Sequence, residues 1–133
     1  GQKARLSDYI RALCTSISQQ ADGIDIEVEA DELELAIERA VPVGLILNEA
    51  ITNSIKYAFG PEGGAIHVKL VGGIGYGEGQ LRISDSGKGM DDSARSGSGL
   101  KLISSLAKQI GGTVAVTSTN KGTTILLTFP IIG

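Results

Sequence analysis

Three polar residues on successive turns of an expected helix form the first group that could do chemistry. Glu49, Asn53 and Lys56 lie in the stretch from Pro42 to Ala58, where apolar residues recur every three to four positions. At about 100° per residue, the three side chains fall within about 60° of arc. A carboxylate can accept a proton, a carboxamide oxygen suits a magnesium ion, and an ammonium group can contact phosphate. The helix pattern alone favours an ordinary solvated face, so the other motifs of the chain are needed to distinguish a functional site from such a face.

A second motif follows an expected strand. Asp85 ends the apolar run around Ile83, and Gly87 and Gly89 come next at alternate positions. A glycine lets a planar ligand or a phosphate approach the backbone, and a carboxylate can accept a hydrogen bond from an amine such as that of adenine. This short pattern equally fits a turn with left-handed glycines.

A third motif, Gly97-Ser98-Gly99-Leu100, comes directly before an expected helix. Free N–H groups and the positive end of the helix dipole make such a position suitable for phosphate. The motif lacks the Gly-Lys-Ser/Thr ending of a P-loop and does not directly leave a strand as a dinucleotide fold requires. An ordinary helix N-cap through Ser98 is the alternative.

Helices and hairpins must hold these motifs. Because they do not alternate strictly, they predict an α/β fold, a two-layer sandwich with a mixed sheet and helices on one face. The glycine-rich half of the chain, which holds 16 of the 19 glycines from Gly60 onward, is expected to supply the binding loops. The apolar spacing predicts helices over 3–20, 42–58 and 100–110 and strands over 24–30, about 33–37, 66–70, 81–83, 114–119 and 123–129.

Composition narrows the function classes. The chain has 133 residues, 41% hydrophobic and 20% charged, which excludes disorder and fits one domain over 1–133. A net charge of −3 with scattered basic residues argues against nucleic acid. Cys14 stands alone among apolar residues and is expected to be a small buried hydrophobe. No apolar run is long enough for a membrane span and no signal peptide is evident, so we expect a cytoplasmic location and no membrane contact.

Taken in order, the motifs resemble those of the GHKL ATPase superfamily, and within it the ATP-binding domain of bacterial sensor histidine kinases. The stretch from Glu49 to Tyr57 resembles the N box, and Asp85-x-Gly87-x-Gly89 the G1 box. Gly97-x-Gly99-Leu100 resembles the G2 box, and Gly122-Thr123-Thr124 the closing Gly-Thr motif. The stretches 45–49 and 106–112 look most like kinases with the second type of dimerisation domain and the related HWE group, although Tyr57 stands where many relatives have histidine and the chain has no tryptophan.

The resemblance implies a Bergerat ATP-binding fold, with ATP and Mg²⁺ as cofactors. It implies that Glu49 acts as or orients the general base and that Asn53 ligates Mg²⁺. The other residues that it implies in nucleotide binding are Lys56, Tyr57, Asp85, Gly87, Gly89, Gly97, Ser98, Gly99, Leu100 and Thr123. It also implies a mobile ATP lid over Met90–Ser96.

The resemblance further implies that the γ-phosphoryl group goes to a histidine on a separate dimerisation domain of the same protein, and from there to a response regulator. The full protein is then expected to be a homodimer, and residues 1–20 to end an upstream helical segment. The sole histidine, His67, lies between two apolar residues of an expected strand and should point to the opposite face, so we expect it to be a surface residue. The histidine that accepts the phosphoryl group is then expected outside this chain. Two alternatives remain: a serine protein kinase of the anti-sigma-factor type, and a degenerate phosphotransfer scaffold that has lost ATP.

Overall fold

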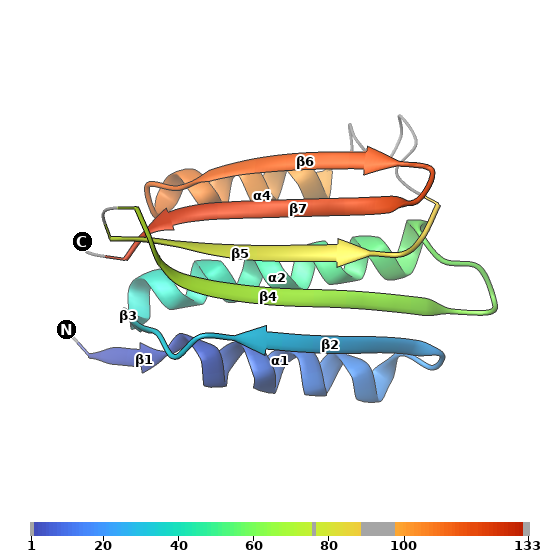
Figure 1. Ribbon diagram of the computed structural model, residues 1–133, viewed down its shortest axis with the longest axis horizontal. Helices are drawn as coiled ribbons and strands as arrows, with labels where there is room; N and C mark the ends of the chain where they lie inside the picture. The colour runs from blue at the N-terminus through green and yellow to red at the C-terminus, as the bar shows by residue number, and fades with distance from the viewer. Residues whose placement is uncertain (1, 76, 89–97, 132–133) are drawn as a thin grey trace.

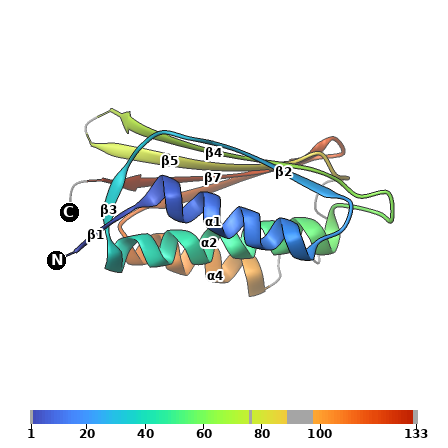
Figure 2. The ribbon, with the colours of Figure 1, turned by 90° about the horizontal axis from the view of Figure 1, so that it is seen from below.

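The chain forms two layers, a sheet and a helical layer packed on one of its faces. The computed structural model describes residues 2–75, 77–88 and 98–131. Figure 2 shows the helices together on one side of the sheet, while the other side is uncovered by any described element. The elements, labelled in Figure 1, are β1 (Lys3–Arg5), α1 (Leu6–Gln20), β2 (Ile24–Ala30), β3 (Glu34–Ala36), α2 (Ile37–Tyr57), β4 (Gly64–Ile74), β5 (Glu78–Asp85), α4 (Ser98–Gln109), β6 (Thr113–Thr119) and β7 (Gly122–Pro130).

The main sheet is mixed, as predicted. Its strands lie in the order β2-β4-β5-β7-β6, with β2 parallel to β4 and the other neighbours antiparallel. The short strands β1 and β3 form a separate antiparallel pair. Because β4 and β5 form a hairpin and β7 pairs with β5, the C-terminal end of β5 lies in the middle of the sheet.

Alternation along each strand sets the two faces of the sheet. On β5, Leu81 and Ile83 are buried beneath the helices, whereas Gln80 and Arg82 point to the uncovered face. The same alternation runs through β4 and β7, so one continuous apolar core lies between sheet and helices. Cys14 of α1 belongs to this core at 3% exposure, as predicted, and burial raises the pKa of its thiol from 9.0 to about 11.

The starts of all three helices differ from the sequence-based prediction, and α4 begins at Ser98 rather than after the glycine motif, at Leu100. Residues Lys3–Arg5 pair with β3 as a strand, so the first helix begins at Leu6. The second helix begins five residues before Pro42, at Ile37, whose N–H donates to the Gln2 carbonyl. Pro42 was expected in the first turn because it cannot donate a helical hydrogen bond, yet it lies inside the helix and is buried. Packing against the core therefore outweighs the loss of one bond.

Helix α2 lies between α1 and α4 and contacts both. Its Gly44 faces the ring of Tyr9 on α1, at a point where a Cβ atom would overlap that ring. On the other side, Arg39 Nη2 donates to the Ile110 carbonyl at the end of α4, over 2.8 Å. These contacts fix α2 in the centre of the helical layer. No helix within residues 2–75, 77–88 and 98–131 combines the length and apolar character needed to cross a membrane.

Candidate nucleotide site

Asp85 is the centre of a small hydrogen-bonded cluster at the C-terminal end of β5. Its Oδ2 accepts from the Ser54 hydroxyl of α2 over 2.8 Å. Its Oδ1 accepts from the backbone N–H of Gly87 over 3.0 Å and from that of Thr123 on β7 over 3.1 Å. Three segments that are far apart in the sequence thus hold one carboxylate in a fixed orientation.

The cluster leaves part of the carboxylate available. An ionised carboxylate offers about four lone-pair positions, and the three donors use two of them on Oδ1 and one on Oδ2. Oδ2 can therefore accept one more hydrogen bond, and an amine is a suitable donor. Asp85 as a whole is half-buried.

Ser54 was not singled out from the sequence. It is 8% exposed and lies on the buried face of α2, where its neighbours one turn away are apolar. A hydroxyl at such a position needs a partner inside the protein, and this requirement is the signal that could have identified it. Ser54 directly follows Asn53, so the proposed metal ligand and the anchor of Asp85 lie on the same turn of α2.

Two glycines bring backbone against the cluster. A Cβ atom on Gly87 would overlap Ala58 at the end of α2, and one on Gly122 would overlap the carbonyl oxygen of Asp85. Gly122 also has φ of +141°, a backbone conformation that other residues rarely adopt. The β6–β7 turn and the loop after β5 therefore pack tightly only with glycine at these positions.

Asn53 lies next to the start of α4. The carboxamide of Asn53 is half-buried, and a Cβ atom on Gly99 would come within 2.6 Å of its Nδ2. Gly99 is the second residue of α4, so the free N–H groups and the positive dipole end of that helix are beside the carboxamide. Leu100 packs against the core and anchors this end of α4.

The remaining predicted residues are placed as follows. Glu49 is half-buried one turn before Asn53, and Lys56 is exposed on the last turn of α2. The Lys56 ammonium lies 5.9 Å from the centre of the ring of the exposed Tyr57. Thr123 is 4% exposed, and its hydroxyl shares a hydrogen bond of 2.9 Å with that of Ser118.

Part of the predicted site lies outside the described residues. Gly89, Gly97 and the predicted lid over Met90–Ser96 all belong to that part of the chain. Ser98 is the first residue of α4.

A hollow of about 420 Å³ borders the cluster at Gly87. It lies between the end of α2, the loop after β5 and the β6–β7 turn, and Ala58, Lys88 and Asn120 are among its lining residues. Within the described residues, no three histidine, cysteine, aspartate or glutamate side chains form a group that could hold a metal ion. Asn53 is not among the lining residues of this hollow. A cation bound at Asn53 would therefore rely on one carboxamide oxygen together with ligand oxygens and water, a ligand set typical of Mg²⁺.

Known proteins resemble this chain in sequence and in fold. Residues 38–132 match the family described as histidine kinase-, DNA gyrase B-, and HSP90-like ATPase. A curated relative, blue-light-activated histidine kinase 2 of Erythrobacter litoralis (strain HTCC2594), is 27% identical over 135 residues. The alignment covers 95% of this chain but only 38% of that kinase.

Solved structures share the fold. The histidine kinase domain of the blue-light-activated kinase EL346 from Erythrobacter litoralis superposes with a TM-score of 0.84 at 21% identity, covering 96% of this chain and 61% of that one. The mycobacterial sensor histidine kinase MprB gives a TM-score of 0.79 at 20% identity, covering 97% and 96%. Full-length ShkA in complex with AMPPNP gives 0.77 at 20% identity, covering 97% and 30%.

These findings confirm the predicted fold class and the predicted resemblance. The family match covers most of the chain, including nearly all of α2, Asp85 and the β6–β7 hairpin. The curated relative, EL346 and MprB are each described as histidine kinases. The chain therefore belongs to the histidine kinase-, DNA gyrase B- and HSP90-like ATPase family.

Proposed function

We propose that this domain binds Mg-ATP between α2, α4 and the end of β5, and that it transfers the γ-phosphoryl group to a histidine on a separate dimerisation domain. The observation that carries the proposal is the geometry of Asp85. Three donors fix its carboxylate and leave one acceptor position, and one of these donors, Ser54, lies on the same turn of α2 as Asn53. A base-recognising group and a metal-ligating group then lie at the two ends of one nucleotide.

Asp85 would recognise the adenine end. The free lone pair of Oδ2 suits the exocyclic amine of adenine, and the tight backbone at Gly87 would let the base approach. The Thr123 N–H donates to Oδ1 of Asp85, so Thr123 would act on the adenine base indirectly, by holding the Asp85 carboxylate in position. Gly89, which has no side chain, is proposed to leave further room for the base to approach the backbone.

Asn53 and α4 would hold the phosphate end. The carboxamide oxygen of Asn53 would ligate Mg²⁺, which neutralises phosphate charge when bound. The N-terminal N–H groups of α4, from Ser98 through Leu100, would donate to phosphate oxygens, and the N–H of Gly97, which lies outside the described residues, is proposed to do the same. Lys56, on the last turn of α2, would add a positive charge, and Tyr57 would contact the nucleotide beside it.

Glu49 would assist the transfer itself. It is half-buried one turn from Asn53, so it would lie on the phosphate side of the site. There it would accept or orient the proton of the attacking imidazole while the phosphoryl group moves in line. Most of the rate enhancement would come from positioning and charge neutralisation.

The acceptor histidine would be supplied by the dimerisation domain. His67 is exposed on the uncovered face of β4, with Nε2 3.3 Å from Glu29 Oε2, and thus on the opposite side of the sheet from α2. The chain spans 38% of the curated relative, so the dimerisation domain, a response regulator and a homodimeric state are proposals for the whole protein. Use of ATP fits the expected cytoplasmic location.

Binding of a fluorescent ATP analogue, with and without Mg²⁺, tests the proposal. The wild-type domain should bind saturably at micromolar to millimolar nucleotide, and Asn53→Ala should remove most of the Mg²⁺ dependence. Asn48→Ala is the matched control because Asn48 is an exposed asparagine on the same helix. Absence of saturable binding, or equal affinity in the Asn53 and Asn48 variants, would contradict the proposed site.

Phosphorylation of the full protein distinguishes the alternatives. A histidine kinase yields a phosphoramidate that acid hydrolyses, whereas a serine kinase of the anti-sigma-factor type yields an acid-stable phosphoester. A degenerate scaffold yields neither and shows no rise in melting temperature with Mg-ATP.

A further inference from the structure

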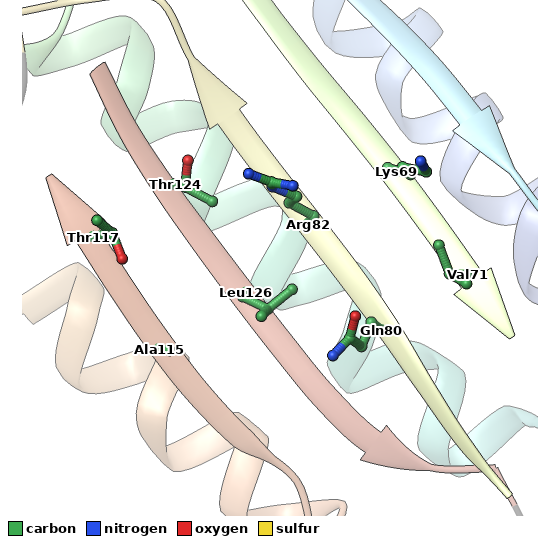
Figure 3. A pocket seen from close by; sticks show the side chains of 8 residues that line it. All are labelled: Lys69, Val71, Gln80, Arg82, Ala115, Thr117, Thr124 and Leu126. Atoms are coloured by element: carbon green, nitrogen blue, oxygen red, sulfur yellow. The ribbon is translucent and has the colours of Figure 1, made fainter. Parts of the chain in front are cut away.

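The uncovered face of the sheet carries a second candidate site, well separated from α2. Figure 2 shows that the described helices all lie on the opposite side of the sheet. A shallow hollow of about 450 Å³ extends across β4, β5, β7 and β6 on the uncovered face. Figure 3 shows the side chains that line it.

The charges on this face are sorted by strand. The edge strand β2 turns three acids outward, Asp25, Glu27 and Glu29. The next two strands turn Lys69 and Arg82 outward at directly opposed positions of the β4–β5 ladder. Like charges directly opposite each other destabilise a sheet. In Figure 3 the two charged ends turn away from each other.

Among the described residues, no counter-ion relieves this pair. Glu29 on β2 lies opposite Lys69 in the register of the β2–β4 pair, but its carboxylate lies next to the His67 imidazole. Within the part of the chain that the structure describes, no carboxylate lies within ion-pair distance of Lys69 or Arg82. A pair of like charges that destabilises the centre of a sheet, where the other residues suit the fold, is typical of a functional position.

The rest of the hollow complements these cations. Its lining contains no carboxylate, and Thr117, Thr124 and Gln80 supply hydroxyl and amide donors. Apolar contact comes from Leu126, Val71 and Ala115. The surface thus combines two positive charges with a small apolar floor.

We propose that this face docks an acidic, extended polypeptide segment of a partner protein. A small anion would be held on one side only, because the hollow is open, whereas binding pockets enclose most of a small ligand. An extended segment can cross several strands and make many shallow contacts. The acids on β2 repel such a segment from that edge and direct it towards β5, β7 and β6.

An NMR titration of the isotope-labelled chain with blocked hexapeptides tests the proposal. Glu-Ser-Glu-Ser-Leu-Ser places two carboxylates about 7 Å apart and one leucine on the same side of an extended chain. It should shift the amides of β5 and β7 saturably at low salt, and Lys-Ser-Lys-Ser-Leu-Ser should not. Addition of salt should weaken the binding.

Charge-reversal variants provide the decisive comparison. The double variant Lys69→Glu/Arg82→Glu should bind the acidic peptide roughly tenfold more weakly, because two exposed ion pairs are lost. Arg11→Glu/Lys108→Glu is the matched control, with the same change in net charge on exposed helix positions. The single variant Arg82→Glu should weaken binding and raise the melting temperature, because it replaces a like-charge pair with an opposite-charge pair and its register neighbour on β7 is the uncharged Leu126.

Three results would overturn the proposal. These are equal binding of the acidic and basic peptides, equal loss of binding in the two double variants, and a concentration-dependent dimer that the Lys69/Arg82 double variant abolishes. The last result would assign this face to a second copy of the chain. Nucleotide affinity should be unchanged in the double variant, so the outcome is independent of the proposed ATP site.

Discussion

Removing the Asp85 carboxylate should destabilise the fold even without nucleotide. In Asp85→Ala the Ser54 hydroxyl and the Thr123 N–H, both buried, lose their acceptor. Each such loss costs about 1–3 kcal/mol, and the half-buried Gly87 N–H adds less because water can reach it. We therefore expect Asp85→Ala to lower the free energy of unfolding by about 3 kcal/mol.

Asp85→Asn should cost much less. The amide oxygen can take the place of Oδ1 and accept both backbone N–H groups, and the new NH₂ group can donate to the Ser54 hydroxyl oxygen. What is lost is the charge, which makes such bonds roughly twice as strong. We expect a loss of about 1 kcal/mol.

Urea unfolding followed by circular dichroism measures both values. For 133 residues, an unfolding entropy of about 2.1 cal/mol/K per residue converts 3 kcal/mol into a fall of roughly 10 °C in melting temperature. Asp31→Ala is the control, because Asp31 makes one exposed bond to the Gly72 N–H over 3.0 Å and should cost below about 1 kcal/mol. If Asp85→Ala is no worse than Asp31→Ala, or if the alanine and asparagine variants are equal, the three-donor account of Asp85 is wrong.

Three further predictions concern single positions. Gly99→Ala places a methyl group against the Asn53 carboxamide, so it should weaken Mg-ATP analogue binding about tenfold or more while changing the melting temperature by only a few degrees; a large loss of stability with intact binding would contradict this. Gly44→Ala should lower stability in the wild type but raise it by up to about 1 kcal/mol in a Tyr9→Ala background, because the overlap disappears and the helix propensity of alanine remains; urea unfolding of the four proteins checks the sign change. For Cys14, burial raises the pKa of the folded thiol from its ordinary value of 9.0 to about 11, so the unfolded chain loses this proton first. Stability should be complete below pH 9 and fall by roughly 2–3 kcal/mol towards pH 11. Cys14→Ala should lack this part of the alkaline decline, and identical pH profiles would refute the assignment.

The sequence alone predicted the layers because apolar periodicity reports burial directly. The strand residues 81 and 83 and the helix residues 47 and 51 are buried as their spacing implied. Helix starts were less predictable, since Pro42 is favourable in a first turn but tolerated further inside when it is buried. The strand at Lys3–Arg5 was missed because its partner β3 lies about 30 residues away.

Contacts between distant segments could not be predicted from patterns. Asp85 was identified by its glycine neighbours, but its bond to Ser54 depends on how α2 crosses β5. The opposition of Lys69 and Arg82 likewise requires the register of the β4–β5 hairpin, which the bulge between Val71 and Ile74 changes. Sequence patterns locate residue types on elements, and tertiary packing decides which of them meet.

The three donors to Asp85 also tie ligand recognition to the order in which the domain folds. Ser54 is 31 positions before Asp85 and Thr123 is 38 positions after it, so the carboxylate is fully held only when the central helix and the last hairpin have both docked. Such long loops close late on a folding pathway. A partly synthesised or locally opened chain should therefore lack the proposed adenine contact, and nucleotide should protect the last hairpin against hydrogen exchange.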